Sequence, residues 1–272
     1  MFKTKITFFN ACEISNELKM KIENLLKEEG ICNPFISSEN TSIGFIKNFQ
    51  YRIIDDIFIG EEIERHINDF ALINKEIDEN TKDNIIETLK GLIGTIAIDK
   101  YIGEDSIIEI PESINNIPVT AVSSMAFYSH NSFVNSGKIF SPFVPIHTIK
   151  LPNTIKYLGV NSFACNDIKN VELSKNLMFI GNTAFDSNKI RDLVFPNNLK
   201  FIGRRAFSKN QLSKVRINNK CIIHSEAFSN NPLKEVFLNE SLYKNRKLYF
   251  KNLDNKRSND SLFEEISFNI IK

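Results

Sequence analysis

The sequence predicts an α+β protein in which a small N-terminal α+β domain precedes a repeat solenoid with a parallel β-sheet. Three observations support this: a Phe-anchored repeat, an amphipathic helix near the N-terminus, and an uneven split of charge along the 272 residues. Residues 1–100 hold 12 Lys/Arg against 18 Asp/Glu, whereas the remainder hold 22 against 15. Because separate domains often differ in charge, we expect an acidic domain at 1–94, a solenoid at 95–240 and a C-terminal cap at 241–272.

The first 94 residues alternate between strand and helix patterns. Acidic side chains gather in their second half, where a solvated helix face is the plain explanation. The alternative is a surface that attracts a basic groove on a partner, with Glu61, Glu62 and Glu64 as its candidate residues. The predicted elements are a strand at 2–9, a helix at 14–30, one or two strands at 42–59, and a helical region at 61–92 with a break around 78–80.

Five phenylalanines mark a repeat whose period is about 22 residues. After each of the last four, Asn stands at +3, an aliphatic residue at +5, and apolar residues at +8 and +10; another aliphatic residue stands at −5. Such a period is typical of a solenoid, in which each unit buries its apolar face against its neighbours. The anchors, spaced by 36, 22, 22 and 21 residues, are Phe127, Phe163, Phe185, Phe207 and Phe228.

Each repeat position predicts a structural role. Positions +8 and +10 alternate as a short strand with one buried face, so stacked units predict a parallel sheet. The Asn amides are expected to satisfy backbone groups where the chain turns. Gly159, Gly181 and Gly203, at −4, indicate either unusual dihedral angles or a tight backbone approach.

The outward positions +7 and +9 form two ladders, which we predict as a binding face for a protein partner. A solvent-exposed strand also needs polar side chains there, so both interpretations stand. The ladder residues are Asn170, Glu172, Asp192, Val194, Lys214, Arg216, Glu235 and Phe237.

An insertion at about 128–148 widens the first repeat spacing, and it is rich in phenylalanine. Packing against the first solenoid turns would explain this. An exposed apolar patch for a partner, formed by Phe140 and Phe143, is the alternative. In the tail, Leu248, Phe250 and residues 266–271 are expected to cap the last repeat.

Residues 107–127 (IIEIPESINNIPVTAVSSMAF), with IKLPNTIKYLGVNSFACNDIKNVEL and LVFPNNLKFIGRRAFSKNQLSKVRI further on, resemble the BspA-like leucine-rich repeats of bacteria and some protists. The resemblance covers about residues 95–240. It implies a leucine-rich repeat solenoid with a binding surface, commonly on secreted or surface-attached proteins. The first residues show no export signal, so we expect a cytoplasmic protein without membrane contact.

No chemical motif stands out. Phosphate-binding, dinucleotide-binding, zinc-protease and serine-hydrolase patterns do not occur, and the four cysteines lack metal-ligand spacing. We therefore expect no catalytic residues, no cofactor and no metal, and free thiols at Cys12, Cys32, Cys165 and Cys221. Basic side chains of the repeat half also allow nucleic-acid binding, but acidic neighbours dilute them.

The function expected from these patterns is an intracellular protein-binding module without enzymatic activity. It would be an adaptor or inhibitor, such as one that a phage or mobile element directs against a host system. Two other functions stay open: a small enzyme with its active site in the N-terminal domain, and an exported adhesin that uses the repeat surface.

Overall fold

The structure is a computed structural model that describes residues 43–71, 79–128, 145–217, 221–250 and 266–271. Several sequence-based predictions lie outside these ranges: the strand at 2–9, the helix at 14–30, Cys12, Cys32, and the candidate residues Phe140 and Phe143.

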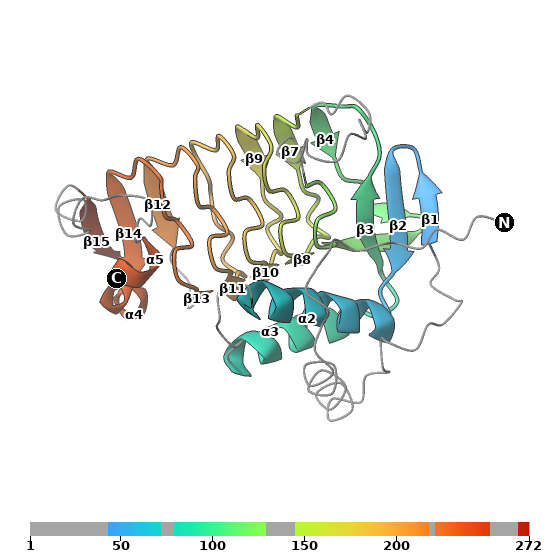
Figure 1. Cartoon of the computed structure of the whole chain (residues 1–272), viewed down its shortest axis with the longest axis horizontal. Helices are drawn as coiled ribbons and strands as arrows, with labels where there is room; N and C mark the ends of the chain where they lie inside the picture. The colour runs from blue at the N-terminus through green and yellow to red at the C-terminus, as the bar shows by residue number, and fades with distance from the viewer. Residues whose placement is uncertain (1–42, 72–78, 129–144, 218–220, 251–265, 272) are drawn as a thin grey trace.

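A nine-stranded sheet runs along the repeat array (Figure 1). Its first three strands are antiparallel neighbours, and from β3 onward the main path is parallel. The order is β1-β2-β3-β6-β8-β10-β11-β13, and β5 pairs with β6 at the side of this path. The strands are β1 (Ile43–Ile46), β2 (Phe49–Ile53), β3 (Ile96–Tyr101), β5 (Ser113–Ile114), β6 (Ile117–Val122), β8 (Tyr157–Leu158), β10 (Phe179–Ile180), β11 (Phe201–Ile202) and β13 (Ile222–Ile223).

Two three-stranded parallel sheets, β4-β7-β9 and β12-β14-β15, lie on the other side of the solenoid (Figure 1). They contain the predicted +8 strands, but residues 191–195 form no strand between them. At the inward +10 position of that unit, Phe195 replaces an aliphatic residue, and its ring packs edge-on against Phe207 and Phe228. The strands are β4 (Ile107–Glu109), β7 (Thr148–Lys150), β9 (Asn170–Glu172), β12 (Lys214–Ile217), β14 (Glu235–Asn239) and β15 (Ser267–Ile271).

The Phe anchors form one continuous stack inside the solenoid. Ring centroids of successive anchors are 4.8, 5.1, 5.3 and 5.7 Å apart, and all five rings are buried. Phe250 continues the stack, 5.2 Å from Phe228. Each unit thus supplies one ring to a shared core, which confirms the predicted repeat solenoid with parallel sheets.

The Asn residues at +3 satisfy the backbone of the turns, as expected. Asn188 Oδ1 accepts from the Ile168 N–H at 3.0 Å, and its Nδ2 donates to the carbonyl oxygens of Phe163 and Phe185 at 3.0 and 3.1 Å. Asn166, Asn210 and Asn231 make the same set of bonds in their own units. Each amide therefore links two neighbouring coils.

Replacing Asn188 with Ala is expected to lower the free energy of unfolding by about 2 kcal/mol, because the buried Ile168 N–H loses its acceptor and the Phe163 carbonyl keeps only its bond from Asn166. Asn198, an exposed side chain that bonds the Lys175 carbonyl, provides the control. Its replacement by Ala should change stability by less than about 0.5 kcal/mol. Urea unfolding of both variants measures the difference, and equal losses would contradict the role of the buried amide.

The glycines at −4 mark a tight approach between coils. A Cβ on Gly181 would lie 2.6 Å from the carbonyl carbon of Gly159, and one on Gly203 would lie 2.5 Å from the Asn182 nitrogen. None of these glycines has a positive φ; among the described glycines only Gly94 has one, at 82°. Of the two predicted reasons for glycine, close packing is confirmed.

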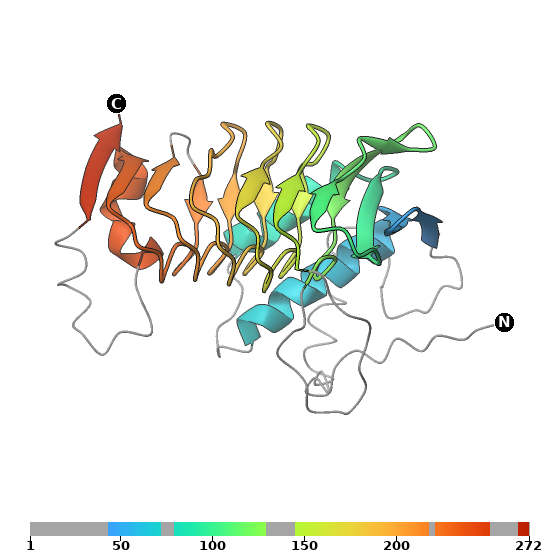
Figure 2. The same ribbon diagram turned by 90° about the horizontal axis from the view of Figure 1, so that it is seen from above.

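Two helices cover the outer face of the nine-stranded sheet (Figures 1 and 2). The helical prediction is confirmed, although the first helix begins earlier than predicted, and Glu79 and Asn80 lie inside the second helix instead of in a break. The Asp55 carboxylate accepts from the Phe58 N–H at 2.8 Å and caps the first helix. The helices are α2 (Asp56–Ala71) and α3 (Glu79–Lys90).

The helices share an apolar core with the repeats. Tyr157, Phe179 and Phe201 stack at 5.1 and 4.4 Å on the outer face of the sheet, and all three are fully buried. The strand pair β2–β3 joins the two predicted domains in one sheet. The division of the chain into two folding units near residue 94 stays a prediction. The helical side chains of this core are Phe58, Ile59, Ile63, Ile85, Ile86 and Leu89.

The C-terminal residues close the last repeat. β15 pairs in parallel with β14, and Phe250 is buried, as expected of a cap. The prediction for Leu248 is wrong: its side chain is 53% exposed, while its carbonyl accepts from the Glu226 N–H. The short helices here are α4 (Glu240–Lys244) and α5 (Arg246–Tyr249).

Candidate functional site

The predicted ladders lie on the outward face of the two three-stranded sheets. In the register of β12 and β14, Lys214 lies beside Glu235 and Arg216 beside Phe237. Asp192 and Val194 occupy the unpaired segment between the sheets, so the ladders are not continuous. Of the eight predicted residues, all are exposed except Phe237, which is half-buried: Asn170, Glu172, Asp192, Val194, Lys214, Arg216, Glu235 and Phe237.

An aromatic and cationic cluster stands out at the C-terminal part of this face. The Phe237 ring lies 4.8 Å from the Lys214 Nζ and 5.5 Å from the Arg216 guanidinium carbon. Lys214 also pairs with Glu235 at 2.9 Å. Val194 is 87% exposed, the highest value among the large apolar side chains of the described residues. Aromatic and arginine side chains are enriched in protein interfaces, so the cluster suits a protein partner.

The N-terminal part of the face carries alternating charge. Lys150 Nζ lies 2.6 Å from the Glu109 carboxylate, and Glu172 occupies the next position in the register. The hydrogen bond to Glu109 and the charges of Glu109 and Glu172 raise the pKa of Lys150. Opposite charges on adjacent strands favour this pairing of the strands.

The predicted acidic surface on the first helix is wrong for Glu62, which is fully buried. Glu61 is half-buried and pairs with Arg52 at 2.6 Å. Glu64 is also half-buried. The helix turns Glu62 toward the sheet, because Glu62 lies on the same stripe as the apolar residues of α2.

Glu62 is the centre of a buried hydrogen-bond network. Its carboxylate accepts from the Ser124 hydroxyl at 2.6 Å, the Ser124 N–H at 3.0 Å, the Tyr157 hydroxyl at 2.9 Å and the Arg65 guanidinium at 2.7 Å. Burial alone would raise the pKa of Glu62, but the Arg65 charge and the Ser124 bonds outweigh it and lower that pKa. The carboxylate is therefore ionised, and it fastens α2 to strands of the repeat array.

His66 completes this network. Its Nε2 lies 3.1 Å from the Tyr157 hydroxyl, and its ring packs edge-on against Phe179. The Tyr157 proton goes to Glu62, so His66 Nε2–H is the donor to Tyr157. Burial lowers the pKa of His66 to about 4, which keeps the ring neutral at pH 7. Both His66 and Glu62 are fully buried. The network therefore holds α2 against the sheet, and these two side chains are not accessible to a substrate.

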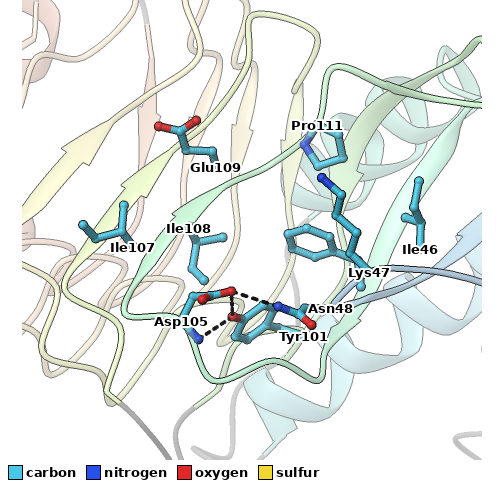
Figure 3. Close-up of a pocket in the computed structure, with 10 residues that line it drawn as sticks. Ile46, Lys47, Asn48, Tyr101, Asp105, Ile107, Ile108, Glu109 and Pro111 are labelled. Carbon is cyan, nitrogen blue, oxygen red and sulfur yellow. Dashed lines mark hydrogen bonds between the residues drawn. The ribbon is translucent and has the colours of Figure 1, made fainter.

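A cavity of about 390 Å³ lies at the N-terminal end of the array, between the β1–β2 turn and β4 (Figure 3). At its base, Asp105 accepts from Asn48 Nδ2 at 2.8 Å and from the Tyr101 hydroxyl at 3.1 Å. No sequence pattern indicates this cavity, because its walls come from segments that lie far apart in the chain. Its lining residues are Ile46, Lys47, Asn48, Phe49, Tyr101, Asp105, Ile107, Ile108, Glu109 and Pro111.

Neither a metal site nor a membrane span is found in the described ranges. No three His, Cys, Asp or Glu side chains there are placed to hold a metal ion. No helix in these ranges has the length and apolar character needed to span a membrane. Of the two cysteines in these ranges, both are free; Cys221 is buried and Cys165 half-buried.

Comparison with known proteins identifies the repeats. The family model for the BspA type leucine rich repeat region matches residues 104–211 and 136–257, in six copies. A search of curated proteins finds no match.

Solved structures include similar chains. A leucine-rich repeat protein of T. pallidum has 23% identity and a TM-score of 0.43, with 64% of this chain and 78% of that one covered. The pneumococcal vaccine antigen PcpA has 19% identity and a TM-score of 0.43, with 75% and 51% covered. A leucine-rich repeat protein from Bacteroides capillosus has 16% identity and a TM-score of 0.32, with 84% and 98% covered.

Proposed function

This chain belongs to the BspA-type leucine-rich repeat family, and we propose that it is a non-enzymatic protein-binding module. The proposed contact surface is the outward face of β12 and β14 together with Val194. The observation that supports it most is the Phe237 ring, which lies 4.8 Å from the Lys214 Nζ and 5.5 Å from the Arg216 guanidinium carbon on the same outward face as the exposed Val194.

Two physical properties favour this face. The ring and the cations are held by parallel strands over a stacked core, so binding orders few side chains and loses little conformational entropy. Aromatic and arginine side chains also dominate the binding energy of protein interfaces. The finer proposal is an adaptor or inhibitor in the cytoplasm, which follows the expectation from the sequence.

The test is affinity capture from a lysate of the source organism with the full chain as bait. Replacing both Val194 and Phe237 with Ser is expected to reduce recovery of the specific partner by at least about tenfold, because each truncation removes apolar contact at the centre of the interface. Circular dichroism should show an unchanged fold.

A matched control replaces Ile222 with Ser, since Ile222 is 37% exposed on β13, in the nine-stranded sheet. This variant should retain the partner. A partner that is lost with the Ile222 variant and kept by the double variant would place binding on the other sheet and overturn the proposal.

A further inference from the structure

β4 is an edge strand whose unpaired side faces the cavity. Among the strands that the structure describes, β4 pairs only with β7, and Ile107, Ile108 and Glu109 all line the cavity. Across the cavity lies the β1–β2 turn with Lys47 and Asn48 (Figure 3). An edge strand of this kind offers its backbone to another extended segment.

The hydrogen-bond pattern shows which backbone groups of β4 face away from β7. The Thr148 N–H donates to the Ser106 carbonyl and the Ile110 N–H to the Lys150 carbonyl, both at 3.2 Å. In a parallel ladder, alternate residues bond to one side, so 106, 108 and 110 face β7. The N–H and C=O groups of Ile107 and Glu109 therefore face away from β7, and within the described ranges they have no hydrogen-bond partner.

The cavity floor suits an apolar side chain. Phe49 and Ile108 are buried there, and Ile46 and Tyr101 are half-buried around them. A residue paired opposite Ile108 would point to the same inner side as Ile108, because side chains alternate along a strand. An aliphatic residue at that place would bury its side chain on this floor.

The outer side of the edge suits a cation. The ladder of Glu109, Lys150 and Glu172 alternates in sign from strand to strand. A strand added next to Glu109 would continue this ladder, and a Lys or Arg there would meet a carboxylate on one side. Ile107, which is 60% exposed, stands two residues before Glu109 on the same face of β4. It would give the added strand an apolar neighbour there.

We propose that β4 binds an extended segment of a partner protein by parallel strand addition, with an aliphatic residue in the cavity followed directly by Lys or Arg beside Glu109. The N–H of the aliphatic residue donates to the Ile107 carbonyl, and its C=O accepts from the Glu109 N–H. Main-chain bonds supply affinity and the two side chains supply specificity, as in other strand-addition complexes. This site lies at the opposite end of the array from the Phe237 cluster, so it stands independently of the proposed function (Figure 1).

Fluorescence anisotropy with a labelled peptide of sequence TVTIKVT tests the proposal on the full chain. Methylating the backbone nitrogen of the peptide Ile should abolish binding, because that N–H faces β4. Methylating the nitrogen of the following Lys should leave affinity within about twofold, because that N–H faces away from β4. Equal effects of the two methylations, or no binding of the parent peptide, would overturn strand addition at this edge.

Two protein variants test the register. Glu109→Lys should weaken the parent peptide about tenfold, since like charges then meet at the added rung. Glu172→Lys makes the same change in the same ladder, two strands from the edge, and should leave affinity unchanged. Equal weakening by both variants would indicate attraction by overall charge and contradict the proposed register. Both variants are checked for an unchanged melting temperature.

Discussion

Replacing Glu62 with Ala is expected to lower the free energy of unfolding by about 3 kcal/mol. Arg65 would lose the nearer of two carboxylate partners, at 2.7 Å, and keep Glu61 at 3.9 Å, while the buried Ser124 N–H and hydroxyl would lose their acceptor. Removing one member of a buried ion pair costs about 3 to 5 kcal/mol where the remaining charge is left uncompensated, and the remaining Glu61 contact keeps the cost for Arg65 at the lower end. The Arg65 side chain is 25% exposed, so water relieves part of this penalty and favours the lower figure.

Glu87 provides the control for this change. It pairs with Lys200 at 3.0 Å and thereby also links a covering helix to the repeats, but its side chain is 70% exposed. Exposed ion pairs contribute between 0 and about 1 kcal/mol, so Glu87→Ala should be nearly neutral. Guanidinium unfolding followed by circular dichroism measures both. If Glu62→Ala proves as mild as Glu87→Ala, the buried network does not hold α2 on the sheet.

The repeat was predictable because identical side chains recur at fixed spacing. Phe185 and Phe207 stack, and Asn188 and Asn210 bond the turns, at the positions that the 22-residue register predicts. Recurrence of this kind reports the fold directly, since each unit must offer the same contacts to its neighbours. Strand alternation likewise predicted which ladder residues are exposed.

The burial of Glu62 was not predicted because acidic residues surround it in the sequence. The signal was present in the spacing: Phe58, Ile59, Ile63 and His66 fall on the same helical stripe as Glu62, which places the carboxylate among apolar neighbours. A charge in such a stripe implies a buried partner. Arg65, three residues away, is one such partner, but Ser124 and Tyr157 are 62 and 95 residues away, and only the tertiary fold brings them there.

The repeat sequence also indicates that a second layer covers the nine-stranded sheet. Tyr157, Phe179 and Phe201 stand directly before the aliphatic −5 residues, so both faces of these short strands are apolar. A strand that is apolar on both faces needs a second layer. The cavity beside β4 left no such signal, because it depends on the distance between two separate segments and not on a repeated pattern.

Lowering the pH from 7 to 4 is expected to reduce the free energy of unfolding by about 3 kcal/mol through His66 alone. Burial lowers its pKa in the folded state to about 4, while an unfolded histidine has its ordinary value near 6.5. Below pH 6.5 the unfolded chain takes up the proton first, so the stabilising contribution is present above pH 6.5 and is lost as the pH falls toward 4. The Glu62 charge favours protonation and His224 opposes it, but neither outweighs burial.

The variant His66→Gln separates this effect from other titrations. Gln keeps an amide donor for the Tyr157 hydroxyl and has no proton to gain, so the fall in stability between pH 6.5 and 4.5 should be much smaller than in the parent chain. Glu62, whose pKa is lowered in the folded state, contributes stability that is lost only as the pH falls below its ordinary value of 4.5. Urea unfolding at half-unit steps of pH resolves the two windows. A parent-like slope in His66→Gln above pH 4.5 would assign the acid sensitivity to groups other than His66.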